Sequence, residues 1–198
     1  MHGVQCHLNH EVDVKDIQSI QPDVVVLATG SRPALPPVEG IDKDIVITYE
    51  DVLNGGPPSY HRVVVIGGGP TGLELALHLA ESGCGTTVVE MLPKIGRGLE
   101  AITKKVILSR LKKHQAAILT DTRLLKIVQN GVVVANKDHR EQFIQADKVV
   151  IAVGTRSDTR LYEKIKSLGY EIFQIGDCLE PRDAKEAIYE SALLGRRI

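Results

Sequence analysis

The chain has 198 residues, a formal net charge of -1 and an isoelectric point near 6.7. This near-neutral balance, with aromatic residues at only 4% and no tryptophan, gives no reason to expect a nucleic acid or an anionic membrane as a partner. No apolar run approaches the roughly 18 residues that a membrane span needs, and no leader pattern opens the chain, so we expect a cytoplasmic protein.

The first residues alternate in character and predict a short strand over residues 3–9. A metal site could also be imagined from His2, Cys6, His7 and His10. The strand is favoured because Cys6 and His7 would point to opposite faces of an extended segment, whereas metal ligands must converge. The three cysteines are odd in number and far apart, so they predict no disulfide framework.

A weak helix or irregular connector over 11–20 leads to a clear apolar strand over 24–28, which ends at Thr29 and Gly30. An apolar strand that breaks at a small-residue turn presents the carboxyl edge of an α/β sheet to a ligand. The proline-rich stretch over 33–40 then predicts a stiff, extended linker between domains.

A short strand over 45–47 and a helix starting at Thr48 close the first part of the chain. Thr48 and Asp51 have the spacing of a capping box, and the glycines and prolines over 54–58 end the helix. We therefore predict a domain boundary at residue 58.

The centre of the sequence is an apolar strand over 63–66 followed by a G-x-G-x-x-G motif at Gly67, Gly69 and Gly72. Gly67 permits the tight turn, Gly69 lets a pyrophosphate approach the backbone, and Gly72 lets the following helix pack closely on the strand. The helix predicted over 70–81 offers its free N–H groups and its dipole to an anion. The residues expected to contact a dinucleotide at this turn are Gly67, Gly68, Gly69, Thr71 and Gly72.

The next strand, over 86–90, ends at Glu90, which lies 23 residues after Gly67. A dinucleotide fold places the acid that binds the adenine ribose at about this distance. A carboxylate there accepts hydrogen bonds from both ribose hydroxyls and repels a 2′-phosphate, so the sequence predicts a preference for NADH over NADPH. Lys94 and Arg97 follow closely and would weaken that preference if they folded back.

After the second helix the sequence predicts a return to the sheet, and the apolar residues then alternate as in strands, with a hairpin turn at Asn130-Gly131. A second apolar strand ends at Gly154, as the earlier one ends at Gly30. The near-repeat indicates two nucleotide-binding, Rossmann-like lobes of related design in an α/β protein, with a three-stranded antiparallel meander on a parallel sheet. The predicted elements are a helix over 99–114, strands over 116–120, 122–128, 131–135, 143–144 and 149–153, a helix over 160–168, a strand over 170–174 and a helix over 183–196.

In this order the motifs resemble the two-dinucleotide-domain flavoprotein reductases, which have the pyridine nucleotide-disulfide oxidoreductase fold. The segment Gly176-Asp177-Cys178, followed by Pro181-Arg182 and Glu186-Ala187-Ile188, is similar to the C-terminal half of the 2,4-dienoyl-CoA reductase, enoate reductase and trimethylamine dehydrogenase group. The resemblance covers essentially the whole chain.

The resemblance implies that residues 1–58 and 155–198 form a partial FAD-binding-type domain and that residues 59–154 form an inserted NAD(P)-binding domain. Asp177 resembles the acid that hydrogen-bonds the ribityl chain of FAD. The other cofactor-binding residues that it implies are Thr29, Gly30, Gly154 and Gly176. The parent chemistry is hydride transfer from NADH to FAD and then to a flavin on a separate barrel, with no catalytic acid, base or nucleophile supplied by the side chains.

The chain also departs from that family. It has one G-x-G-x-x-G motif instead of two, no barrel that would carry FMN and an iron-sulfur cluster, and Ser191 where the family has glycine. We therefore expect a fragment in which binding of FAD is in doubt. The alternatives are an isolated NAD(H)-binding module and a structural remnant without activity. Open edges on the strands over 24–28 and 151–153 would favour a homodimer.

Overall fold

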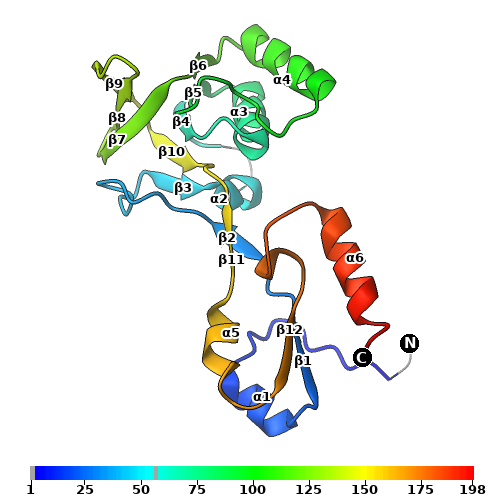
Figure 1. The fold of residues 1–198 in the computed structure, drawn as a ribbon. Coiled ribbons are helices and arrows are strands. Elements are labelled where there is room, and N and C mark those ends of the chain that lie inside the picture. The colour runs from blue at the N-terminus through cyan, green and yellow to red at the C-terminus, as the bar shows by residue number, and fades with distance from the viewer. Residues whose placement is uncertain (1–2, 56–57) are drawn as a thin grey trace. The chain divides into compact units, whose positions relative to one another are not determined.

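The computed structural model describes residues 3–55 and 58–198, which belong to two compact units (Figure 1). Unit 1 combines the chain up to Arg32 with Arg156–Ile198, and unit 2 is the continuous segment Pro33–Thr155. The sequence placed the first boundary at residue 58, but strand β3 (Val46–Thr48) pairs with β10 (Lys148–Ile151) inside unit 2. The second division lies beside the predicted boundary at 154/155.

Unit 2 is built on a five-stranded sheet in which all neighbouring strands are parallel. The strand order is β3, β10, β4 (Arg62–Ile66), β5 (Gly85–Val89) and β6 (Ala117–Leu119). Side chains of β4 alternate between two cores, because successive residues of a strand point to opposite faces. Val63 and Val65 pack with the helices, whereas Val64 and Ile66 pack with the antiparallel strands.

The helical face of this sheet carries α2 (Tyr49–Asn54), α3 (Pro70–Glu81) and α4 (Ala101–Lys113). The predicted capping box at α2 is present, with the Thr48 and Asp51 side chains each accepting a backbone N–H of the other residue. Its helix ends at Asn54; Gly56 and Pro57, which the sequence assigned to the stop signal, lie outside the described residues. Glu100 caps α4 by accepting the N–H groups of Ile102 and Thr103.

The opposite face carries the meander of β7 (Thr122–Val128), β8 (Gly131–Asn136) and β9 (Glu141–Gln145), as predicted. The α/β class and the combination of parallel and antiparallel sheets are therefore confirmed. The predicted open edge at residues 151–153 is wrong, because β10 has β3 on one side and β4 on the other.

Unit 1 is smaller and contains a two-stranded parallel sheet of β1 (Val24–Leu27) and β12 (Glu171–Gln174). Its buried core is formed by Ile17, Leu27, Ile165 and Cys178. Its other elements are α1 (Val14–Ile20), α5 (Arg160–Ile165), the 3-10 turn η1 (Gly176–Cys178) and α6 (Ala184–Leu194). Strand β2 (Ser31–Pro33) pairs with β11 (Thr155–Ser157) where the chain passes between the units.

The strand predicted over residues 3–9 is absent from the described residues, since this segment is exposed and pairs with no described strand. His2 of the alternative metal site lies outside the described part of the chain. The imidazole of His10 instead meets the carboxylate of Asp16 at 3.0 Å. Among the described residues, none of the helices has the length and apolar character that crossing a membrane would require.

Candidate dinucleotide-binding site

The glycine turn between β4 and α3 has the geometry that the motif predicts. Gly67 has a φ of +110°, and a side chain there would collide with the carbonyl of Ala152. A side chain at Gly72 would collide with the carbonyl of Gly67, so this glycine allows α3 to start directly against the turn. By contrast, no atom lies within 4 Å of the place where a side chain would extend from Gly69. That space lies at the N-cap of α3, and helix N-termini are suited to binding anions.

The start of α3 leaves backbone donors free beside this space. Gly69 is the N-cap, and the N–H of Leu73 already bonds its carbonyl at 3.0 Å. Pro70 has no N–H to offer. The N–H groups of Thr71 and Gly72 have no acceptor among the described residues, and the Thr71 side chain is exposed beside them. These groups can donate to a phosphate together with the positive end of the helix dipole.

Glu90 lies at the carboxyl end of β5 and connects the turn to the loop that follows. One carboxylate oxygen accepts the N–H of Gly68 at 2.7 Å, and the other accepts the N–H of Leu92 at 2.8 Å. The residue is only 9% exposed. A carboxylate oxygen accepts more than one hydrogen bond, so both oxygens keep room for a ribose hydroxyl. The two backbone bonds fix the direction in which they point.

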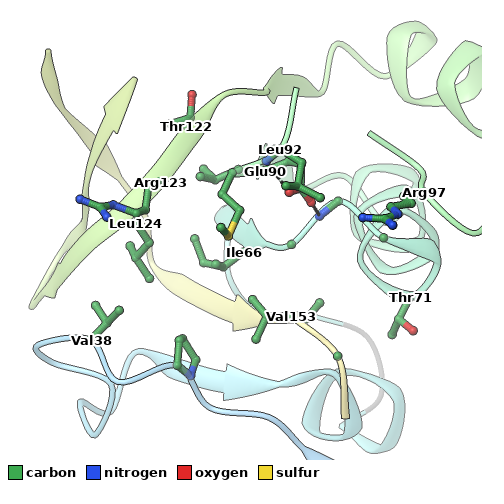
Figure 2. A pocket seen from close by; sticks show the side chains of 18 of the residues that line it. Val38, Ile66, Thr71, Glu90, Leu92, Arg97, Thr122, Arg123, Leu124 and Val153 are labelled. Atoms are coloured by element: carbon green, nitrogen blue, oxygen red, sulfur yellow. Dashed lines mark hydrogen bonds between the residues drawn. The ribbon is translucent and has the colours of Figure 1, made fainter. Parts of the chain in front are cut away.

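These groups surround a cavity of about 790 Å³, within the size range of small-molecule and cofactor sites (Figure 2). Figure 2 shows Val38, Ile66, Leu124 and Val153 around one part of the cavity, while Thr71 and Arg97 lie on the side of the cavity where α3 is drawn. The sequence-predicted residues that line it are Gly67, Gly68, Gly69, Thr71, Glu90 and Gly154. Gly72 is not among the lining residues; the side of Gly72 that would carry a side chain faces the Gly67 carbonyl.

The proline-rich segment over residues 34–40, here called the proline strap, forms part of the cavity wall. The sequence predicted only a linker for it. The N–H of Ala34 donates to the carbonyl of Gly154 at 3.0 Å, and the carbonyl of Glu39 accepts the N–H of Ile127 at 2.8 Å. Pro36, Pro37 and Val38 line the cavity between these two anchors. The sequence signal that could have indicated this role was the glycine at position 40. In the structure Gly40 has a φ of +81°, so the strap ends in a defined turn.

Cations outnumber acids around the cavity. Lys94, Arg97 and Arg123 line it, and none of the three forms an ion pair with a described carboxylate. Glu90 is the acid among the lining residues, and two backbone N–H groups already bond it. The cavity therefore attracts an anionic ligand.

The other predicted site residues lie in unit 1. Because β1 and β12 are parallel neighbours, Thr29 and Gly30 leave the same edge of the small sheet as Gly176 and Asp177. The carboxylate of Asp177 accepts the Ser31 hydroxyl at 3.1 Å. Its second oxygen accepts the backbone N–H of Arg182 at 3.3 Å, and the Thr29 hydroxyl donates to the carbonyl of Asp158 at 2.7 Å.

Glu190 of α6 holds the same turn from the other side. Its carboxylate accepts the N–H of Gly176 at 2.7 Å and also pairs with the Arg182 guanidinium. These hydrogen bonds, first that from Gly176 and then that from Arg182, lower the pKa of Glu190. The turn that carries Asp177 is thus ordered within unit 1.

Asp158 is a buried acid of unit 1 that the sequence did not single out. The Arg160 guanidinium hydrogen-bonds both of its oxygens, which lowers the pKa of Asp158 to about 2 despite the opposing effect of burial. A cavity of about 240 Å³ beside Thr29 is lined by this pair together with Glu11 and Lys164. It is smaller than the about 300 Å³ at which ligand pockets begin, so these residues alone do not enclose a flavin.

The fold and the glycine turn define a class of protein, and sequence comparison agrees: the chain belongs to the pyridine nucleotide-disulphide oxidoreductase family, whose pattern matches residues 2–191. It is 34% identical to the bilirubin reductase of Mediterraneibacter gnavus over 96% of this chain and 30% of that protein. It is 30% identical to the cinnamate reductase of Clostridium sporogenes over 99% of this chain and 30% of that protein.

A solved structure of 2-naphthoyl-CoA reductase in complex with 2-naphthoyl-CoA superposes with a TM-score of 0.90 at 31% identity. The superposition covers 99% of this chain and 30% of that one. The resemblance drawn from the motifs is thereby confirmed. The chain spans about 30% of the length of these relatives.

Proposed function

We propose that unit 2 binds NADH and that the chain is the NADH-binding portion of a flavin-dependent oxidoreductase. The observation that carries this proposal is the open space at Gly69. It lies beside the free N–H groups of Thr71 and Gly72, in the same cavity as the fixed carboxylate of Glu90.

The chemistry of the cavity wall supports one orientation for the ligand. The pyrophosphate would lie over Gly69 and accept from the start of α3, and the adenine ribose would donate to Glu90. The apolar wall formed by Val38, Leu124 and Val153 suits the adenine ring. The nicotinamide supplies the hydride when it is bound, and the described residues of unit 2 orient it.

The same geometry supports a preference for NADH over NADPH. A 2′-phosphate would bring about two negative charges close to the Glu90 carboxylate. Glu90 could relieve this repulsion only by turning away, and that would break its hydrogen bonds with Gly68 and Leu92. Each lost bond leaves a backbone N–H without its acceptor, which costs about 1–3 kcal/mol when the group is buried.

The flavin part of the proposal rests on the family. Relatives of about three times this length are named as reductases of bilirubin, cinnamate and 2-naphthoyl-CoA. We propose that hydride passes from NADH to FAD in the longer protein and that electrons continue to a flavin on a separate barrel. Unit 1 would contribute Asp177 to the FAD site, while the residues that hold the rest of FAD and the final substrate would lie outside this chain.

Replacement of Gly69 by valine tests the proposal, because the side chain would enter the ligand space from a Cβ that has no protein atom within 4 Å. Gly69 has an extended backbone, with φ -74° and ψ -172°, which valine also adopts. We expect calorimetry to show NADH binding to the natural chain and no binding to Gly69→Val at equal thermal stability. Gly85→Ala, at the start of β5 and thus at the opposite end of this strand from Glu90, is the control variant and should bind NADH normally. Failure of the natural chain to bind NADH would reject the proposal.

A second candidate function is an NAD(H)-binding module that is catalytically silent by itself. The small volume of the cavity beside Thr29 favours it. Visible absorption of the purified chain after incubation with FAD and removal of excess separates the two. Retained flavin colour that bleaches with NADH supports a self-contained NADH-to-FAD step, whereas colourless protein that still binds NADH supports the module.

A further inference from the structure

The loop over residues 91–100, which joins β5 to α4, is fastened to the glycine turn at two points on either side of Arg97. The N–H of Gly96 donates to the carbonyl of Gly68 at 2.7 Å. Gly98 lies against the Pro70 ring, which a side chain at residue 98 would meet at 3.5 Å. Both glycines have positive φ, +67° and +93°, so the backbone on both sides of Arg97 has a conformation that residues other than glycine rarely adopt. Residue 97 is consequently held next to the turn itself.

Among the described residues, none forms a hydrogen bond or ion pair with the side chain of Arg97 that would explain this arrangement. It is exposed, lines the cavity and forms no ion pair with a described residue. Figure 2 shows it on the same side of the cavity as Thr71, which lies in the first turn of α3. A long cationic side chain loses rotamer freedom when it is ordered, so an ordered position there needs a ligand to compensate.

The donors available to a pyrophosphate at this turn are fewer than the motif alone suggests. Pro70 supplies no N–H, and the N–H of Gly68 is bonded to Glu90. The N–H groups of Gly69, Thr71 and Gly72 remain, and all three are neutral. A pyrophosphate has two negative charges, and a guanidinium matches phosphate oxygens with two parallel hydrogen bonds. Arg97 is the cation bracketed onto the turn by neighbouring backbone contacts.

We propose that Arg97 binds the pyrophosphate of the dinucleotide; this inference rests on the proposed function of unit 2. A contact with a 2′-phosphate is the competing role for this cation. It is disfavoured because the 2′ position would lie at Glu90, which bonds Gly68 and Leu92, while Gly98 lies against Pro70 at the first residue of α3. Arg97 therefore adds affinity for NADH and NADPH alike and does not choose between them.

The test measures binding of NADH, NADPH, ADP-ribose and adenosine to the natural chain and to Arg97→Gln, Arg97→Lys and Lys94→Gln. Arg97→Gln should weaken NADH, NADPH and ADP-ribose by a common factor of about tenfold or more, since a charge-assisted hydrogen bond is lost. Adenosine, which has no phosphate, should bind as before. Arg97→Lys should recover part of the loss, because the charge returns without the planar fork.

Lys94 lines the same cavity on the same loop but lacks the bracketing glycines, so Lys94→Gln is the matched control and should change NADH affinity less than Arg97→Gln. Equal losses in both variants would show a general charge effect and overturn the inference. A loss confined to NADPH would assign Arg97 to the 2′-phosphate, and unchanged affinities would also overturn it. If the natural chain bound no NADH, the proposed function would fail and this inference with it. Equal thermal unfolding of Arg97→Gln and the natural chain excludes misfolding.

Discussion

Glu90 fixes the glycine turn and also faces the ribose position, and these two roles respond differently to substitution. Glu90→Gln keeps one acceptor oxygen but turns its amide donor toward a backbone N–H, of Gly68 or Leu92. We expect a loss of about 1–3 kcal/mol in the free energy of unfolding. The negative charge is also lost, so the gap between NADH and NADPH affinity should narrow.

Chemical denaturation and parallel titrations with the two nucleotides measure these effects. Glu74→Gln on the exposed face of α3 is the control and should leave both stability and preference unchanged. If Glu90→Gln and Glu90→Ala both retained the natural chain's preference and NADH affinity, the carboxylate would not contact the ribose.

Asp158 predicts a pH dependence for unit 1. Its pKa of about 2 lies below the ordinary value of 3.8 for an aspartate. The contribution of Asp158 to the free energy of unfolding is therefore fully present above pH 3.8 and disappears as the pH falls toward 2. After allowance for solvent screening of the half-exposed Arg160, this contribution is about 1 kcal/mol. Asp158→Asn should therefore be less stable near neutral pH and lose less stability between pH 3.8 and 2.

Urea unfolding at several pH values tests this prediction. The reaction of the buried Cys178 thiol with a labelling reagent follows the unfolding of unit 1 separately. Asp183→Asn, at an exposed carboxylate of the same unit, should keep the acid sensitivity of the natural chain. An acid transition of the same size in Asp158→Asn would mean that the Asp158–Arg160 pair is not its source.

The proline strap depends on how it is anchored to β7. Gly40 has positive φ and faces the carbonyl of Ile127, so a side chain there collides with the backbone. Gly83 also has positive φ, +89°, but has nothing within 4 Å. Gly83→Ala should cost only the backbone strain of about 1–2 kcal/mol. Gly40→Ala should cost more and should also weaken NADH binding, because the collision displaces Pro37 and Val38 from the cavity.

Comparison of the two variants by thermal unfolding and calorimetry separates backbone strain from displacement of the strap. Equal stability losses with normal NADH affinity in both would show that the strap is only a linker.

The elements whose sequence signals are local were predicted well. The G-x-G-x-x-G motif predicted the turn and the start of α3 because the collision that Gly72 avoids lies within the motif, at the Gly67 carbonyl, although Gly67 itself avoids the distant carbonyl of Ala152. The meander was predicted from strand period and the Asn130-Gly131 turn, and the Thr48–Asp51 pair correctly marked the start of α2.

The errors concern segments whose structure depends on distant partners. Residues 3–9 alternate like a strand but have no described strand to pair with, and β10 gained a neighbour because β3 joins the sheet from about one hundred residues away along the chain. The role of the strap depends on Gly154 and Ile127, which no local pattern connects to residues 34–40. The bonding of Glu90 to Gly68 and Leu92 was likewise invisible in the spacing that identified it.

The two units differ greatly in the size of their cores, and two cysteines report on them. Cys178 is fully buried in the four-residue core of unit 1, whereas Cys84 is buried in the larger helical core of unit 2. Local opening needs less free energy where fewer apolar contacts are broken. We therefore expect a thiol reagent to label Cys178 faster than Cys84 under native conditions.

Exposed Cys6 is first replaced by serine so that it does not obscure the kinetics. Mass spectrometry of digested samples then assigns each labelled site. NADH should slow labelling at Cys84 more than at Cys178 if it binds unit 2. Faster labelling of Cys84 than of Cys178 would contradict this ranking of the units.

Association between copies stays a prediction. Of the two edges that the sequence expected to be open, β10 is enclosed within the sheet of unit 2, and β1 is paired with β12 on one side. Light scattering on the chain decides whether β1 leads to a homodimer, and a monodisperse monomer would argue against it.

The division of unit 1 into two separated segments affects the order in which the protein can fold during translation. Val24 pairs with Glu171, so the first strand of unit 1 leaves the ribosome long before its partner. At about 5–20 residues per second, that delay is roughly 7–30 s. Unit 2, which is continuous, can complete its sheet during this interval. Within unit 1, β1 must therefore wait for β12 before this pairing can form, and during this delay the segment is a candidate for chaperone binding.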